Sequence, residues 1–119
     1  MSQLKIESTH DENGFRIIRL SGPFTLEGIF DFQNLYRSAD DPVTLIDLTD
    51  VPYMDSAATG AVITVHVSSQ RHQRKYALIG VSDRLRTLFN VVGVEGLLTM
   101  CPTMEEARKK FGSKTAAQG

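Results

Sequence analysis

Hydrophobic and polar positions follow two different periods along this chain, and together they predict five strands and four helices. Alternating or short continuous apolar runs, bounded by turn residues, indicate strands. Apolar residues three or four positions apart, preceded by a capping residue, indicate helices. We therefore expect strands at residues 4–8, 15–20, 43–48, 76–80 and 97–101, and helices at residues 26–38, 57–72, 83–92 and 104–111.

The order of these elements, ββαβαβαβα, predicts a single α/β domain with a small mixed β-sheet. Residues 9–14, between the first two strands, are rich in turn formers, so these strands are expected to form a hairpin. The third strand is almost continuously apolar between Pro42 and Thr49. That pattern is typical of a strand covered on both faces, so we place it in the centre of the sheet.

The segment 57–72 is ambiguous because its middle is rich in β-branched residues, which favour strands. Its length of about sixteen residues favours a helix. Either Asp55 or Ser56 can cap its start, and a basic stretch follows its end, where the helix dipole favours positive charge. One helical stripe is expected to face the core, and it consists of Ala58, Ala61, Val62 and Val65.

Ile63 and Val67 lie off that core-facing stripe. They form either a second edge of the helix that faces a partner, or merely its apolar flank. The sequence leaves both interpretations open.

Length and composition exclude several classes of protein. A chain of 119 residues fits one domain, and we expect that domain to span residues 1–112, with a disordered tail at 113–119. The chain has 13 basic and 14 acidic residues, which argues against a nucleic-acid partner. Cys101 is the only cysteine, which excludes an internal disulfide and a multi-cysteine zinc site.

The free thiol indicates a reducing compartment, so we expect a cytoplasmic protein. No apolar run approaches the roughly 20 residues needed to cross a bilayer, and the first residues lack the apolar core of a signal peptide. We therefore expect no direct insertion into a membrane.

No pattern of catalytic or cofactor-binding residues stands out. The glycines do not form a phosphate-binding loop, and His66 and His72 are six positions apart, which does not suit a helical metal site. Ser56 lacks the flanking glycines and the base of a nucleophilic serine. We therefore predict a protein that is not an enzyme, with no catalytic residue, no cofactor and no metal.

Ser56 is nevertheless a candidate regulatory residue, since it lies where the helix 57–72 is expected to begin. A serine in that place can simply cap the helix, or it can accept a phosphate. A phosphate would add about −1.5 to −2 charge beside Asp55, and would act mainly by repelling a partner that docks over the helix start.

The string from Leu45 to Ser56, followed by a helix, resembles the STAS domain signature of bacterial anti-sigma-factor antagonists. Two further segments, Lys75–Gly80 and Leu88–Leu97, resemble the next strand and a helix-and-turn of that family. The resemblance covers residues 4–111. It implies a STAS-like single domain, with a small mixed β-sheet and helices packed mainly on one side.

The resemblance also implies a function. Members of this family bind partners and have no enzymatic activity of their own. An anti-sigma factor that is itself a serine kinase phosphorylates the motif serine, which releases the antagonist in a partner-switching cascade, and a serine phosphatase reverses the reaction. By motif match the phosphorylation site is Ser56, and the partner-binding residues are Asp55, Ser56, Ala57, Thr59, Gly60 and Ile63.

The segment after the acceptor departs from the family pattern of Ser or Thr, Gly, a large apolar residue and Gly. Only Gly60 is kept, and Ala58 replaces the first glycine, so we expect an extra methyl group on the contact surface. An alternative function follows from a second resemblance, to STAS-like subunits that brace lipid-transport ABC complexes at the inner membrane. In that role the partner would be an ABC transporter ATPase.

Overall fold

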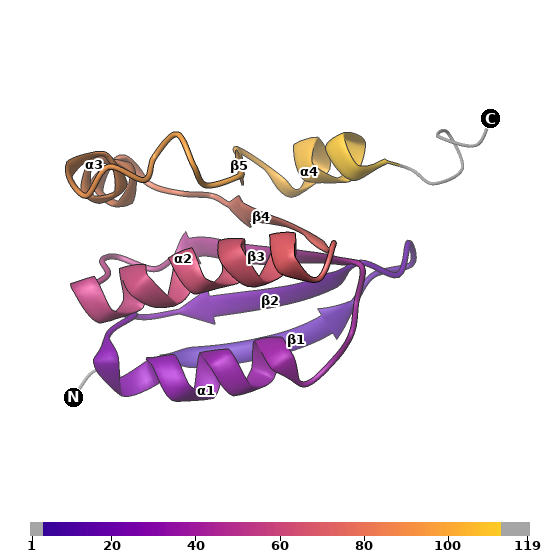
Figure 1. The fold of residues 1–119 in the computed structure, drawn as a ribbon, viewed down its shortest axis with the longest axis horizontal. Helices are drawn as coiled ribbons and strands as arrows, with labels where there is room; N and C mark the ends of the chain where they lie inside the picture. The colour runs from indigo at the N-terminus through magenta and orange to yellow at the C-terminus, as the bar shows by residue number, and fades with distance from the viewer. Residues whose placement is uncertain (1–3, 113–119) are drawn as a thin grey trace.

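The computed structural model describes residues 4–112, which form a five-stranded sheet and four helices (Figure 1). The strands are β1 (Lys5–His10), β2 (Arg16–Ser21), β3 (Val43–Asp50), β4 (Lys75–Ile79) and β5 (Met100–Cys101). The helices are α1 (Leu26–Arg37), α2 (Ser56–Arg71), α3 (Asp83–Val91) and α4 (Met104–Phe111). The predicted α/β class and element order are confirmed. The predicted tail at 113–119 lies outside the described residues.

The sheet has the order β1-β2-β3-β4-β5, with β1 antiparallel to β2 and every other pair parallel. The predicted hairpin is confirmed, and Gly14 completes its turn with φ of +84°. β3 lies in the middle of the sheet and is buried from Val43 to Leu48, as predicted for a strand covered on both faces. Because β2 and β3 are parallel, the helices that follow them begin at the same edge of the sheet.

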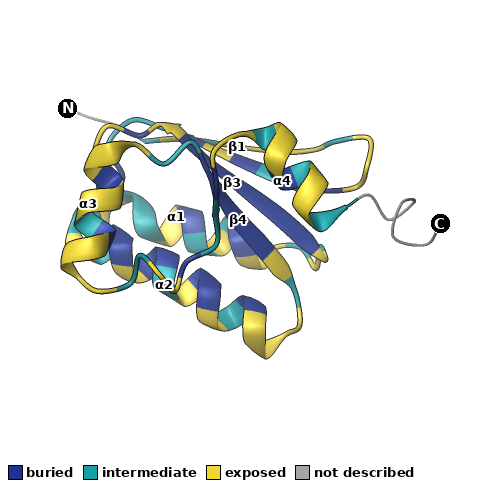
Figure 2. Ribbon diagram, turned by 90° about the horizontal axis from the view of Figure 1, so that it is seen from above, coloured by how far each residue is buried: buried dark blue, intermediate teal, exposed yellow. Residues whose placement is uncertain are grey.

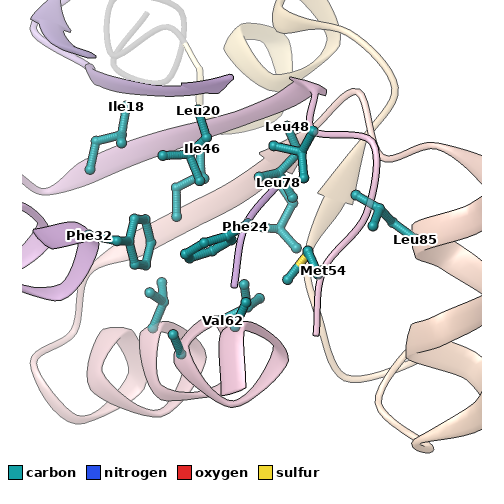
Figure 3. Packing of buried hydrophobic residues seen from close by; sticks show 14 of the residues in the cluster. Ile18, Leu20, Phe24, Phe32, Ile46, Leu48, Met54, Val62, Leu78 and Leu85 are labelled. Carbon is teal, nitrogen blue, oxygen red and sulfur yellow. The ribbon is translucent and has the colours of Figure 1, made fainter. Parts of the chain in front are cut away.

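Helices cover the two faces of the sheet unequally. α1, α2 and α3 pack on one face, and α4 packs on the other (Figure 1, Figure 2). The larger core lies beneath the three helices (Figure 3), and its fully buried members include Ile18, Leu20, Phe24, Phe32, Ile46, Leu48, Val62, Leu78 and Leu85. The smaller core joins Leu45 and Ile79 of the sheet to Ala107 of α4. The predicted placement of the helices mainly on one side is therefore confirmed.

The ambiguous segment is helical, as its length predicted. The predicted core-facing stripe is buried, and it consists of Ala58, Ala61, Val62 and Val65. The strand preference of the β-branched residues is overcome because burial of this stripe against the sheet is worth about 25 cal/mol for each Å² of apolar surface. Ile63 is half-buried and Val67 is 50% exposed, so both lie off the stripe, as expected.

The last strand is shorter than predicted. Residues 97–99 were expected to belong to it, but β5 contains only Met100 and Cys101. The carbonyl of Val94 accepts hydrogen bonds from the N–H groups of Leu97 (2.9 Å) and Leu98 (3.2 Å), which closes this stretch into a turn. Leu98 still packs in the core. The apolar pattern at 97–99 therefore reflects burial of a turn residue, and the sequence pattern could not distinguish this from a strand.

The hydroxyl group of Tyr76 is buried next to α2, and it offers a test of the packing there. It accepts a hydrogen bond from the N–H of Thr99 (3.1 Å) and lies 2.9 Å from His66 Nδ1. Tyr76→Phe removes both interactions, so we expect the free energy of unfolding at pH 7 to fall by about 1–2 kcal/mol.

The effect of Tyr76→Phe should also depend on pH. Burial raises the pKa of Tyr76 above its ordinary value of 10.0. The stabilisation by the protonated hydroxyl is therefore complete below pH 10.0, and is lost as the pH rises through the pKa of the folded state. Urea unfolding of both proteins across this range should show the difference in stability shrinking above pH 10.0. A difference that stays constant would contradict this assignment.

Candidate functional site

The segment between β3 and α2 is tied to the start of α1. The carbonyl of Tyr53 accepts a hydrogen bond from the N–H of Phe24 (3.1 Å), and the N–H of Asp55 donates to the carbonyl of Phe24 (3.3 Å). The side chains of Phe24 and Met54 are both buried in the larger core (Figure 3). The backbone from Tyr53 to Asp55 is therefore held in place by two hydrogen bonds to Phe24 and by the burial of Met54.

The carboxylate of Asp55 connects the first turns of two helices. One oxygen, Oδ1, accepts a hydrogen bond from the N–H of Ala58 in α2 (2.9 Å). The other, Oδ2, accepts one from the N–H of Leu26, the first residue of α1 (3.0 Å). The N-cap residue of α1, Thr25, makes no capping bond with its own side chain. Asp55 therefore accepts a hydrogen bond from the N–H of Leu26, a group that has no acceptor within its own helix.

Ser56 is the first residue of α2 and is exposed. Of the two capping residues considered from the sequence, Asp55 is the N-cap, and the alternative in which Ser56 caps the helix is wrong. The physical reason is that the N-cap residue has extended backbone, and Asp55 has it, with φ of −96° and ψ of −177°. Ser56 consequently stands on the surface at the positive end of the helix dipole.

The two residues that follow Ala57 point inward. Ala58 is fully buried, so its methyl group enters the core, and the expectation that it adds a methyl group to the contact surface is wrong. Thr59 is 3% exposed, and its hydroxyl group donates to the carbonyl of Asp55 (3.0 Å). Thr59 thus supports the turn from behind, while Ala57 is half-buried and Gly60 is exposed.

The solvent-facing side of α2 carries one continuous stripe. Ser56, Gly60, Ile63 and Val67 follow one another at intervals of four, three and four residues, which places them on one helical face. We call these four residues the α2 stripe. It joins the two predicted site residues Gly60 and Ile63 to Ser56, and extends them by Val67.

Two exposed apolar residues of α1 were missed by the sequence interpretation. Leu26 is 59% exposed and Phe30 is 68% exposed, one turn apart on α1, which packs beside α2. The signal was present in the sequence, since both residues lie off the helical face of Ile29, Phe32, Leu35 and Tyr36, whose spacing of three or four indicates the helix. Large apolar side chains exposed on adjacent helices are a recurrent feature of protein interaction sites.

The described residues show no arrangement that suits a metal or a membrane span. Residues 4–112 contain no group of three His, Cys, Asp or Glu side chains placed to hold a metal ion. No helix in the same range is long and apolar enough to cross a membrane.

Comparison with known proteins decides the family. The model of the STAS domain matches residues 6–107. The chain belongs to the STAS domain family. A sequence relative named anti-sigma-B factor antagonist, from Listeria monocytogenes, is 32% identical over 75 residues, which are 63% of this chain and 66% of that protein. The match therefore spans slightly less than two thirds of the relative's own length.

Solved structures support the same fold for this STAS domain. The unphosphorylated form of the anti-sigma factor antagonist SpoIIAA matches with a TM-score of 0.76 and 15% identity, over 92% of this chain and 98% of that one. A sulfate transporter family protein from Wolinella succinogenes matches with a TM-score of 0.70 and 21% identity, over 83% of this chain and 84% of that one. At these identities the matches show the fold alone.

Proposed function

We propose that this STAS domain protein is an anti-sigma-factor antagonist, which acts by binding a partner and not by catalysis. The observation that carries the proposal is the placement of Ser56. This residue is exposed at the first position of α2 and directly follows Asp55, whose carboxylate accepts one hydrogen bond from each of two helices. The name of the Listeria relative supports it. The proposed partner is an anti-sigma factor that is a serine kinase, met in the cytoplasm.

The proposed contact surface consists of Asp55, Ser56, Ala57 and the rest of the α2 stripe, with Leu26 and Phe30 of α1 beside it. Its polar end lies at the helix start, and its apolar part follows along α2. Thr59 belongs to the support of this surface and not to the surface itself, because its side chain is buried.

Phosphorylation of Ser56 would act as a switch on binding. The phosphate would stand in solvent, so the fold has no reason to break, and both oxygens of Asp55 would keep their backbone partners. It would add about −1.5 to −2 charge next to an existing carboxylate, at the place where the partner docks. We infer that this charge releases the kinase, and that a serine phosphatase restores the binding form.

The test compares partner binding by three variants. We expect Ser56→Asp to weaken binding of the kinase by about tenfold or more, a loss of about 1.4 kcal/mol, whereas Ser56→Ala binds like the wild type. Thr87→Asp adds the same charge at an exposed position of α3 and serves as the control. Immobilised proteins are incubated with native lysate, and retained proteins and phosphorylated residues are identified by mass spectrometry.

Three results would count against the switch. Equal retention of a kinase by the wild type and Ser56→Asp would show that charge at Ser56 does not control binding. An equal loss of binding in Thr87→Asp would show that the effect is not local. After incubation of the wild type with the retained kinase and ATP, phosphate found on other residues and not on Ser56 would show that Ser56 is not the acceptor.

The same surface offers a second candidate function, a constitutive subunit that braces an ABC-type lipid-transport complex. The exposed apolar residues Phe30 and Val67 favour it, because the interfaces of permanent complexes are more apolar than those of transient ones. In the same experiment this function predicts retention of a transporter ATPase by the wild type and Ser56→Asp alike.

A further inference from the structure

A cleft of about 260 Å³ lies at the end of α2 that is opposite to Ser56, and the proposed function does not use it. The residues that line it belong to the last turns of α2, the loop into β4 and its first residues, Thr99, and the last residues of α4. Figure 1 shows where these elements lie. The cleft exists because β5 is short. Only Leu78 and Ile79 of β4 pair with β5, so the beginning of β4 has no paired strand on that side.

The charged groups that line this cleft are positive. Arg74, Lys75 and Lys110 contribute side chains to it, and no carboxylate lies among the described residues that line it. Outside the cleft, the exposed carboxylate of Asp40 forms an ion pair with Arg74. A local excess of cationic groups on a concave surface attracts anions, even though the whole chain carries a net charge of −1.

A buried histidine adds a polar group to the wall of the cleft. His66 lines the cleft and is 8% exposed. Its Nδ1 is hydrogen-bonded to the hydroxyl group of Tyr76, at 2.9 Å, and that hydroxyl oxygen also accepts from the N–H of Thr99. Because Nδ1 is engaged in this bond, Nε2 is the ring nitrogen that is left to interact with a ligand.

We propose that this cleft binds the phosphate group of a small phosphate monoester. The charge of about −1.5 to −2 on such a group matches several cationic side chains better than a single carboxylate does. The aromatic side chain of Phe111 lines the same cleft and offers an apolar contact for the organic part of the ligand. The volume lies slightly below the range of about 300–1,000 Å³ that is typical of sites for drug-sized ligands, so the ligand is small.

The probes are phenyl phosphate and inorganic phosphate, titrated into the full ¹⁵N-labelled chain, with the amide signals of Tyr76 and Thr99 recorded by NMR. We expect saturable shifts of these signals, and tighter binding of phenyl phosphate, since it adds an apolar contact with Phe111. Benzyl alcohol, which has the ring without the charge, should cause no saturable shift at the same concentrations.

Charge variants provide the decisive comparison. The double variant Lys75→Gln/Lys110→Gln should bind phenyl phosphate about tenfold more weakly, whereas Lys109→Gln, an exposed neighbour on α4 that does not line the cleft, should stay within about twofold of the wild type. Asp40→Asn should tighten binding, because it releases Arg74 from its ion pair. All three exposed lysines can be changed without disturbing the core, which thermal unfolding will verify.

The proposal is overturned by any of three outcomes. These are the absence of saturable shifts at Tyr76 and Thr99 with millimolar phenyl phosphate, equal binding of benzyl alcohol, and a loss of affinity in Lys109→Gln as large as in the double variant. None of them depends on Ser56, so the cleft and the proposed partner switch are tested separately.

Discussion

Asp55→Ala should lower the free energy of unfolding by about 2–3 kcal/mol, a large effect for a half-exposed residue. The loss of an N-cap costs about 1 kcal/mol, and the loss of a hydrogen bond to a charged acceptor adds about 1.5 kcal/mol. Both apply here, because one oxygen of the carboxylate caps α2 and the other bonds to the first residue of α1. Urea unfolding followed by circular dichroism measures the change.

Two control variants separate this double role from ordinary capping. Asp55→Asn keeps an oxygen acceptor for a helix N–H, so it should retain most of the cap of α2 and lose mainly the link to Leu26. Thr103→Ala removes the side-chain capping bond of α4, which the N–H of Glu106 donates to Thr103 Oγ1, and should cost about 1 kcal/mol. If Asp55→Ala costs no more than Thr103→Ala, the second bond contributes nothing and the two helix starts are independent.

Phe32→Ala should have the largest effect on stability, lowering the free energy of unfolding by about 3–5 kcal/mol. Phe32 is fully buried at the centre of an aromatic row, with its ring centroid 5.2 Å from that of Phe24 and 6.5 Å from that of Tyr36. Removal of the ring loses its own burial and leaves a cavity that these neighbours fill only in part. The same urea measurement tests this expectation.

Phe30→Ala is the matched control, since it removes the same side chain two residues away on α1. Because Phe30 is 68% exposed, the free energy of unfolding should change by no more than about 0.5 kcal/mol. If the proposed contact surface is right, the same variant weakens partner binding while the fold stays intact. Comparable destabilisation by the two variants would mean that the assignment of buried and exposed faces of α1 is wrong.

The sequence pattern located most of the elements because periodicity and capping are local properties. The buried stripe of α2 is visible from four residues. The pattern was wrong at residues 97–99, where an apolar turn imitated a strand. It left the cap of α2 open between Asp55 and Ser56, and the structure decides for Asp55. The hydrophobic pattern placed Ala58 correctly on the core-facing stripe, whereas the comparison with the family motif placed its methyl group wrongly on the contact surface. Burial and capping near a helix start depend on how the incoming loop is held, which a motif alone does not show.

The candidate site was predicted as a segment, and the tertiary structure determined its organisation. Asp55, Ser56 and Gly60 were recognised from the motif, since they are consecutive or nearly so in the sequence. Nothing in the sequence links Asp55 to Leu26, because that bond needs two helices from different parts of the chain to begin at one edge of a sheet. Nor does the sequence alone place α1, which carries Phe30, beside α2.

The sequence by itself determined the fold class, the order of the elements, the central position of β3 and the segment that carries Ser56. These depend on hydrophobic period, turn residues and capping, which act over a few neighbouring positions. The tertiary structure decided which side chain caps α2, which residues of the motif reach the surface, and where the cationic cleft opens. Those properties arise from contacts between segments that are distant along the chain, and only packing of the whole domain brings them together.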